Sequence, residues 1–158
     1  MAEPSLLDDL YREILLDHYR QPRNHGGLPA PTCAADGSNP LCGDQVRIEV
    51  NVEDGRIAGI SFSGSGCSIS QASASMMTEY VKGRTVAEAR AGIEAFQRMM
   101  LTAEAPGLEG FDDIEALIGV AKFPARVKCA SLAWKTLEQA LAGDGTPVTT
   151  DERNVLHA

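Results

Sequence analysis

The chain has 158 residues, of which 44% are hydrophobic and 23% are charged, a composition that suits one globular domain with a substantial core. Its net charge of −8 argues against non-specific nucleic-acid binding and against attraction to an anionic membrane, because both need a basic surface. Residues 1–13 lack the basic and apolar segments of a signal peptide, and residues 57–78 are uncharged but too rich in Ser and Gly for a membrane span. We therefore expect a cytoplasmic protein, whose cysteines are more often metal ligands or reactive thiols than disulfides.

The first predicted element is a helix that begins near Ser5 and ends before Pro22, because apolar residues recur in it at helical spacing. Residues 46–52 alternate apolar and polar side chains, which is typical of a half-buried strand. Asp54-Gly55 supplies the positive-φ residues of a tight hairpin turn, and the return strand continues the alternation. The inward-facing residues expected on that return strand are Ala58, Ile60 and Phe62.

A short run that begins at Cys33 predicts a third strand, so the strands form an antiparallel meander and not a series of βαβ units. Helical patterns follow, and they begin after Cys67, at Thr85, near Asp113 and at Pro124. From Gly143 the chain is polar and aperiodic. The prediction is an α+β fold in which a small antiparallel three-stranded sheet packs against several helices. A single domain spans residues 1–142, and residues 143–158 form a flexible tail.

Three of the four cysteines lie where a predicted element begins. Cys42 precedes a strand, Cys129 lies in the first turns of the last helix, and Cys67 follows SGSG at a helix start, where the dipole and free amides favour a thiolate. Because element ends meet at the rim of a domain, these residues can converge with Asp44, and three thiolates with one carboxylate are a reasonable tetrahedral set for Zn²⁺. The alternative is that the cysteines fill the core, although glycines flank Cys42 and Cys67 and let the backbone approach another group closely.

Charged neighbours give a second indication of a metal site. Zinc with three thiolates and a carboxylate carries a formal charge of about −2, which nearby cations must balance if the site is partly buried. Arg126 and Lys128 flank Cys129 and can supply that balance, or they are two solvated cations on a helix face. Cys33 is expected to pack in the core. His18 continues an apolar helical stripe and is expected to be structural.

Four blocks of the sequence resemble the IscU/NifU-N family, which works in iron–sulfur cluster assembly. CGDQVRIEV, SGSGCSISQASASMMTEYVKGRTVAEA and ARVKCASLAWKTLEQAL look like its three cysteine blocks, and HYRQPRNHGGL looks like its N-terminal block. The likeness covers about residues 5–142. Within the family the chain is most similar to the SufU type, because Lys128 stands where IscU scaffolds have a histidine and because GLEGFDDIEALIGVAKFPAR adds residues before the third cysteine.

The resemblance implies a zinc-dependent sulfurtransferase in which Cys42, Asp44, Cys67 and Cys129 bind zinc, Cys42 accepts the sulfur and Arg126 assists. Its partner would be a PLP-dependent cysteine desulfurase of the SufS type, with SufBCD-type assembly machinery downstream. Two alternatives stay open. One is a scaffold that assembles a [2Fe–2S] cluster on the same cysteines, which the missing histidine disfavours. The other is a zinc-stabilised interaction domain without a reactive thiol.

Overall fold

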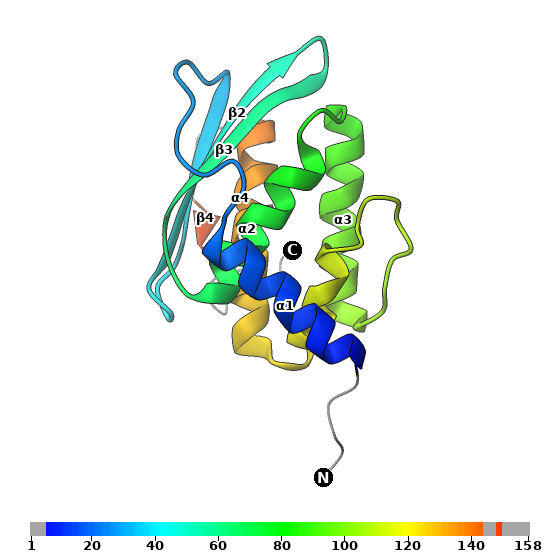
Figure 1. Ribbon diagram of the computed structural model, residues 1–158. Coiled ribbons are helices and arrows are strands. Elements are labelled where there is room, and N and C mark those ends of the chain that lie inside the picture. The colour runs from blue at the N-terminus through cyan, green and yellow to red at the C-terminus, as the bar shows by residue number, and fades with distance from the viewer. Residues whose placement is uncertain (1–5, 144–147, 150–158) are drawn as a thin grey trace.

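The computed structural model describes residues 6–143 and 148–149. The elements in chain order are α1 (Leu6–Arg20), β1 (Cys33–Asn39), β2 (Asp44–Glu53), β3 (Arg56–Ser65), α2 (Ser68–Val81), α3 (Val86–Thr102), the 3₁₀ helix η1 (Ile114–Lys122), α4 (Pro124–Ala142) and β4 (Val148–Thr149). Figure 1 shows the sheet on one side of the molecule and the helices on the other. Helix α4 packs against β1 and β2, α2 packs against β3, and α3 packs against α4.

The three-stranded antiparallel meander predicted from the sequence is confirmed. The strand order is β3-β2-β1-β4, and β1, β2 and β3 pair antiparallel. The short β4 pairs parallel with β1, where Val148 faces Gly37. Both residues of β4, Val148 and Thr149, lie within the predicted flexible tail. The other residues of that tail from 144 onwards lie outside the described residues. The division into a domain and a tail therefore stays a prediction.

A β-bulge changes which residues of β3 face the core. Val50 pairs with Ile60, whereas Val52 pairs with Ile57, so β3 contains one residue more than β2 between these pairs. The extra residue shifts the inward-facing set by one position. The prediction that Ala58 points inward is therefore wrong, because Ala58 is exposed and Ile57 is fully buried.

Helix α2 explains why residues 57–78 carry no charge. It lies between the sheet and the other helices, and nearly every residue from Ser70 to Val81 is buried. Its small side chains allow close helix packing, and Ser73 Oγ donates a hydrogen bond to Ala130 O of α4 at 2.6 Å. Among the described residues no helix is long and apolar enough to cross a membrane. The uncharged stretch therefore forms the half-buried strand β3 and most of the central helix α2.

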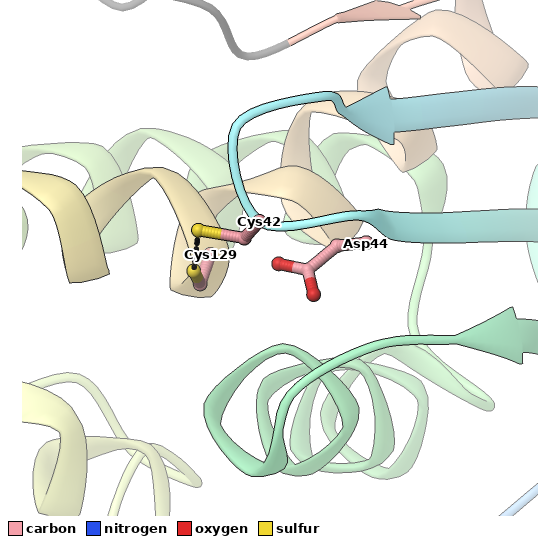
Figure 2. A group of neighbouring side chains, drawn as sticks. All are labelled: Cys42, Asp44 and Cys129. Atoms are coloured by element: carbon pink, nitrogen blue, oxygen red, sulfur yellow. Dashed lines mark hydrogen bonds between the residues drawn. The ribbon is translucent and has the colours of Figure 1, made fainter.

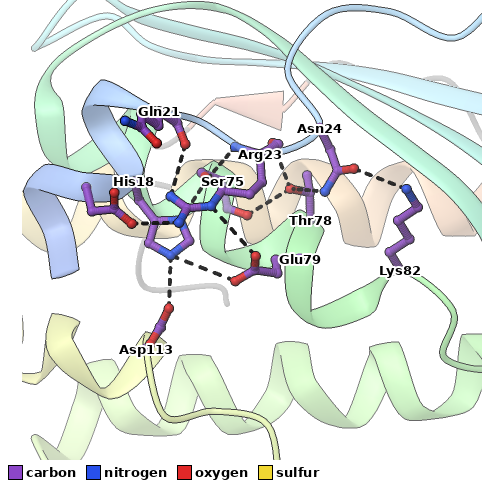
Figure 3. A network of polar contacts seen from close by, with 10 residues as sticks. His18, Gln21, Arg23, Asn24, Ser75, Thr78, Glu79, Lys82 and Asp113 are labelled. Atoms are coloured by element: carbon purple, nitrogen blue, oxygen red, sulfur yellow. Dashed lines mark hydrogen bonds and ion pairs between the residues drawn. The ribbon is translucent and has the colours of Figure 1, made fainter.

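A polar network fixes α1 to the rest of the helical layer (Figure 3). His18 is fully buried, and its Nδ1 lies 2.8 Å from Ser75 Oγ of α2. Its Nε2 lies 3.1 Å from Asp113 Oδ2, directly before η1. Ser75 Oγ also accepts the backbone N–H of Arg23 at 2.8 Å, in the segment that follows α1. His18 thus joins three elements, as a structural residue does.

Candidate metal centre

The four predicted ligands come from three separate parts of the chain that meet at one end of the sheet. Cys42 lies in the turn between β1 and β2, Asp44 is the first residue of β2, Cys67 is the N-cap of α2, and Cys129 lies in the second turn of α4. Figure 2 shows Cys42, Asp44 and Cys129 pointing toward one another. One ligand atom of each of these three residues lies within 4.8 Å of the others. Positions far apart in the chain therefore form one cluster of metal-binding side chains.

Asp44 connects Cys67 to this cluster. Asp44 Oδ1 accepts the backbone N–H of Cys67 at 2.9 Å, and Asp44 Oδ2 lies 3.9 Å from Cys67 Sγ. On the other side, the Sγ atoms of Cys42 and Cys129 are 3.5 Å apart. Cys67 thus adjoins the cluster of Cys42, Asp44 and Cys129 through Asp44, although its sulfur lies outside the group of ligand atoms that are all within 4.8 Å of one another.

Glycines make these approaches possible. A Cβ atom at Gly66 would lie 2.6 Å from Asp44 Oδ1, so only glycine lets this carboxylate approach the start of α2. Gly43 has a φ of 71°, in the left-handed region that glycine adopts without strain, and it separates Cys42 from Asp44. The expectation that the backbone in SGSGC approaches another group closely is therefore confirmed, and that group is the carboxylate of Asp44.

The sulfur of Cys67 lies at the start of α2, where the sequence predicted it. Cys67 Sγ accepts the backbone N–H of Ser70 at 3.5 Å, so the sulfur caps the N-terminus of α2. Free amides and the helix dipole stabilise negative charge at such a position.

The centre has a buried floor and an exposed edge. Asp44 is 1% exposed and Cys129 is 0% exposed, whereas Cys42 is exposed. Burial, and then hydrogen bonding with Cys42 and Asp44, raises the pKa of the Cys129 thiol far above its ordinary value of 9.0. A thiolate at this position therefore needs a cation beside it. Three sulfur donors and one carboxylate fit tetrahedral Zn²⁺, so the donor set agrees with that ion.

The two cations that flank Cys129 differ in environment. Lys128 is only 8% exposed, so its interpretation as a solvated cation is wrong. Arg126 is exposed and lines an open groove together with Tyr11, Lys122 and Phe123. Its side chain therefore lies on the surface one helical turn before Cys129.

Cys33 lies elsewhere. It begins β1, pairs with Val50 and packs at the edge of the hydrophobic core, where burial raises the pKa of its thiol. It is half-buried, so the expected core packing is only partly realised.

Asn39 is a residue of this centre that the sequence did not single out. It is the last residue of β1, is fully buried, and has its Nδ2 3.8 Å from Cys129 Sγ. Its backbone carbonyl accepts the N–H of Cys42 at 3.2 Å. In the sequence, Asn39 is the first residue of the turn NPLC. Asparagine is common at that position of any turn, so its presence there did not indicate a role in the metal centre.

Comparison with known proteins identifies relatives over nearly the whole chain. Residues 10–143 match the family described as NifU-like N terminal domain. The chain is 46% identical over 136 residues to the zinc-dependent sulfurtransferase SufU of Bacillus subtilis (strain 168), which covers 86% of this chain and 92% of that protein. It is 38% identical over 151 residues to the iron–sulfur cluster assembly scaffold protein IscU of Streptococcus pyogenes serotype M1, covering 96% and 94% of the two chains.

Solved structures agree with this relationship. A putative iron–sulfur cluster assembly scaffold protein for the SUF system from Fervidobacterium islandicum AW-1 superimposes with a TM-score of 0.73 at 33% identity, over 82% of this chain and 94% of that one. A hypothetical protein solved at 2.3 Å superimposes with a TM-score of 0.79 at 39% identity, over 85% and 98% of the two chains. The α+β fold predicted from the sequence is therefore shared with these structures.

Proposed function

We propose that this chain, which belongs to the NifU-like N-terminal domain family, is a zinc-dependent sulfurtransferase of iron–sulfur cluster assembly that accepts persulfide sulfur on Cys42. The observation that carries the proposal is the convergence of Cys42, Asp44 and Cys129 within 4.8 Å, with Cys67 joined to them through Asp44. The relative from B. subtilis, whose name states both zinc dependence and sulfur transfer, supports the same reading.

The four side chains divide into holding residues and one reacting residue. When bound, a zinc ion supplies the positive charge that keeps thiols deprotonated near neutral pH. Cys67, Cys129 and Asp44 are the holding residues, because Asp44 and Cys129 are buried and Cys67 is anchored by its backbone N–H. Cys42 is the reacting residue, because it alone among the four is exposed and lies in a turn.

The transfer step is a thiol–disulfide-type exchange. The Cys42 thiolate attacks the terminal sulfur of a persulfide on a partner cysteine, and a new S–S bond forms at Cys42 Sγ. The partner's own S–S bond breaks, and its cysteine leaves as a thiolate. No net oxidation occurs, because one sulfur atom moves from one thiolate to another. The persulfide on Cys42 is then available to an acceptor of the assembly machinery.

We take the donor to be a PLP-dependent cysteine desulfurase of the SufS type and the downstream acceptor to be SufBCD-type machinery. The surface around the centre is suited to a protein partner, since Leu41 is 66% exposed and Phe123 is 61% exposed. Arg126 lies with Phe123 in the adjacent groove, where a cation can steer an acidic partner surface. This position supports its assignment as an assisting residue that acts during docking.

A persulfide-mapping experiment tests the proposal. The purified chain is incubated with the desulfurase and cysteine, free thiols and persulfides are alkylated, and peptides are identified by mass spectrometry, with zinc measured by elemental analysis. We expect one zinc ion per chain and additional sulfur on Cys42. A zinc-loaded chain that never receives sulfur would instead be an interaction domain.

A second candidate function is a scaffold for a [2Fe–2S] cluster. The name of the S. pyogenes relative and the three thiolates favour it, because thiolates hold iron–sulfur clusters as well as zinc. Anaerobic reconstitution with iron and sulfide separates the two. A stable brown protein that passes its cluster to an apo-protein supports the scaffold, and a colourless zinc protein supports the sulfurtransferase.

A further inference from the structure

Asn39 contacts more of the candidate ligands than its place in the sequence suggests. Its backbone carbonyl accepts the N–H of Cys42 at 3.2 Å, and its Nδ2 lies 3.8 Å from Cys129 Sγ. It also pairs with Asp44 across the ladder between β1 and β2. Asn39, which is fully buried, therefore lies beside three of the four candidate ligands, and its side chain contacts one of them, Cys129.

We infer that Asn39 is a positioning residue of the metal centre, which fixes the sulfur of Cys129 by an N–H···S hydrogen bond and fixes the turn of Cys42 through its backbone. This inference rests on the proposed function, since it assumes that Cys129 binds a metal as a thiolate. A donor aimed at a thiolate stabilises its charge and fixes the direction of its lone pairs. Groups that orient metal ligands in this way are a regular part of metal sites.

The unpaired oxygen of Asn39 supports a role beyond packing. Within the described part of the chain, Asn39 Oδ1 is buried without a hydrogen-bond partner. Such a group costs free energy, so an apolar side chain of the same shape would serve the core better. The side chain must also point its Nδ2 toward the sulfur, because the opposite orientation would place oxygen lone pairs against an anion. The amide is therefore explained by its contact with sulfur.

The two contacts of Asn39 match the different tasks of the two cysteines. The side chain contacts Cys129, which is fully buried and is assigned to hold the metal throughout. Only the backbone contacts Cys42, so the turn stays anchored while the Cys42 side chain remains free to rotate toward a partner. Asn39 thus holds the sulfur of Cys129 in place and leaves the sulfur of Cys42 able to move.

Cobalt substitution tests this inference directly. Zinc is spectroscopically silent, whereas Co²⁺ in a thiolate site absorbs through sulfur-to-metal charge transfer, so the band reports on the sulfur that Asn39 contacts. The variants are Asn39→Asp, which keeps the shape but turns a second oxygen toward Cys129, and Asn39→Leu, which removes the donor without adding charge. Asn51→Asp is the matched control, because Asn51 on β2 accepts the N–H of Thr32 through Oδ1 at 3.0 Å, as an aspartate also can.

We expect both Asn39 variants to bind Co²⁺ and Zn²⁺ about 10- to 100-fold more weakly in chelator competition, the range typical when a group that orients a ligand is lost. The charge-transfer band should shift in both, whereas the control should match the wild type in affinity and spectrum.

Unchanged affinity and an unshifted band in Asn39→Asp and Asn39→Leu would overturn the inference. A loss of metal-free stability with a wild-type cobalt spectrum would also overturn it, since the role would then be structural only. If the wild type itself binds neither metal, the proposed function fails, and that result is distinct from either outcome.

Discussion

The Sγ atoms of Cys42 and Cys129 lie 3.5 Å apart, although 87 positions separate them in the chain. Cys42 is exposed and Cys129 is fully buried, so one centre contains a sulfur that a partner can reach and a sulfur that it cannot. This difference in exposure supports the proposed reacting role of Cys42.

Replacing Cys42 by alanine should abolish sulfur acceptance, because the exposed nucleophile is lost while the three holding residues remain. The measurement is stimulation of the desulfurase with cysteine as substrate, together with mass spectrometry of trapped persulfides. Cys33→Ala is the control, since Cys33 begins β1 and lies outside the centre. Normal stimulation by Cys42→Ala would remove Cys42 from the nucleophile role.

Asp44 has two tasks that substitutions can separate. Asp44→Asn keeps an acceptor for the N–H of Cys67 but loses the anionic ligand, so we expect weaker zinc binding with the start of α2 intact. Asp44→Ala loses both the ligand and the acceptor, and it should also lower the free energy of unfolding of the metal-free protein by about 1–3 kcal/mol. Competition with a chromogenic chelator and urea denaturation measure the two effects. Equal zinc affinity in all three proteins would show that Asp44 is not a ligand.

Removing zinc should destabilise the protein, because the ion binds the folded chain and not the unfolded one. At a free zinc concentration 100 times the dissociation constant, the stabilisation is about 2.7 kcal/mol. For a chain of this size that corresponds to roughly 5–10 °C in the thermal midpoint. Circular dichroism before and after chelation, with zinc loss verified by elemental analysis, tests this. An unchanged midpoint after complete removal contradicts it.

Ser75→Ala should destabilise the fold without affecting the metal centre. The substitution leaves His18 Nδ1 and the backbone N–H of Arg23 without the hydroxyl that both contact at 2.8 Å. Unsatisfied buried groups of this kind cost about 1–3 kcal/mol. Urea denaturation of the metal-free protein measures the loss, and Ser68→Ala at the exposed start of α2 provides a matched control. Equal stability of the two variants would show that the His18 network contributes little.

Glu49 should make stability depend on pH in acid solution. The backbone N–H of Leu28, and then the Arg47 side chain, lower the pKa of Glu49 from its ordinary value of 4.5. A group whose pKa is lower in the folded state adds stability above its unfolded pKa, and this stability is lost as the pH falls through the folded value. The metal-free wild type should therefore exceed Glu49→Gln in stability near neutral pH, and the difference should shrink as the pH falls below the ordinary glutamate pKa of 4.5.

Urea denaturation at several pH values measures that difference. Glu53→Gln is a charge-matched control at the exposed end of the same strand. A difference between wild type and Glu49→Gln that grows as the pH falls would contradict the assigned contacts.

The alternation of apolar and polar residues predicted the strands of the sheet, and the prediction was wrong where a β-bulge interrupts that alternation. Alternation over residues 46–52 identified β2 correctly, because a strand with one buried face repeats every two residues. The bulge in β3 broke that repetition, so Ala58 was assigned to the wrong face. The burial of Lys128 was likewise not predicted, because it depends on how α4 packs against other elements in space.

The candidate ligand set could be predicted from the sequence because its cysteines share a signal. Cys42, Cys67 and Cys129 lie near element starts, and glycines flank two of them, as a shared site at a domain rim requires. Asn39 carries no such signal. Its contact with Cys129 depends on the positions of β1 and α4 in space, and only coordinates supply those.

Trp134 lies at the centre of the helical layer, five residues after Cys129 on α4. Its ring stacks on Phe96 at 4.4 Å, and its Nε1 donates to Ser73 Oγ at 3.0 Å. Because the chain contains one tryptophan, its tryptophan fluorescence originates from this single site. The emission therefore reports on α4, the helix that carries the buried sulfur of Cys129, and comparing it with and without zinc tests whether the candidate centre is coupled to the helical core.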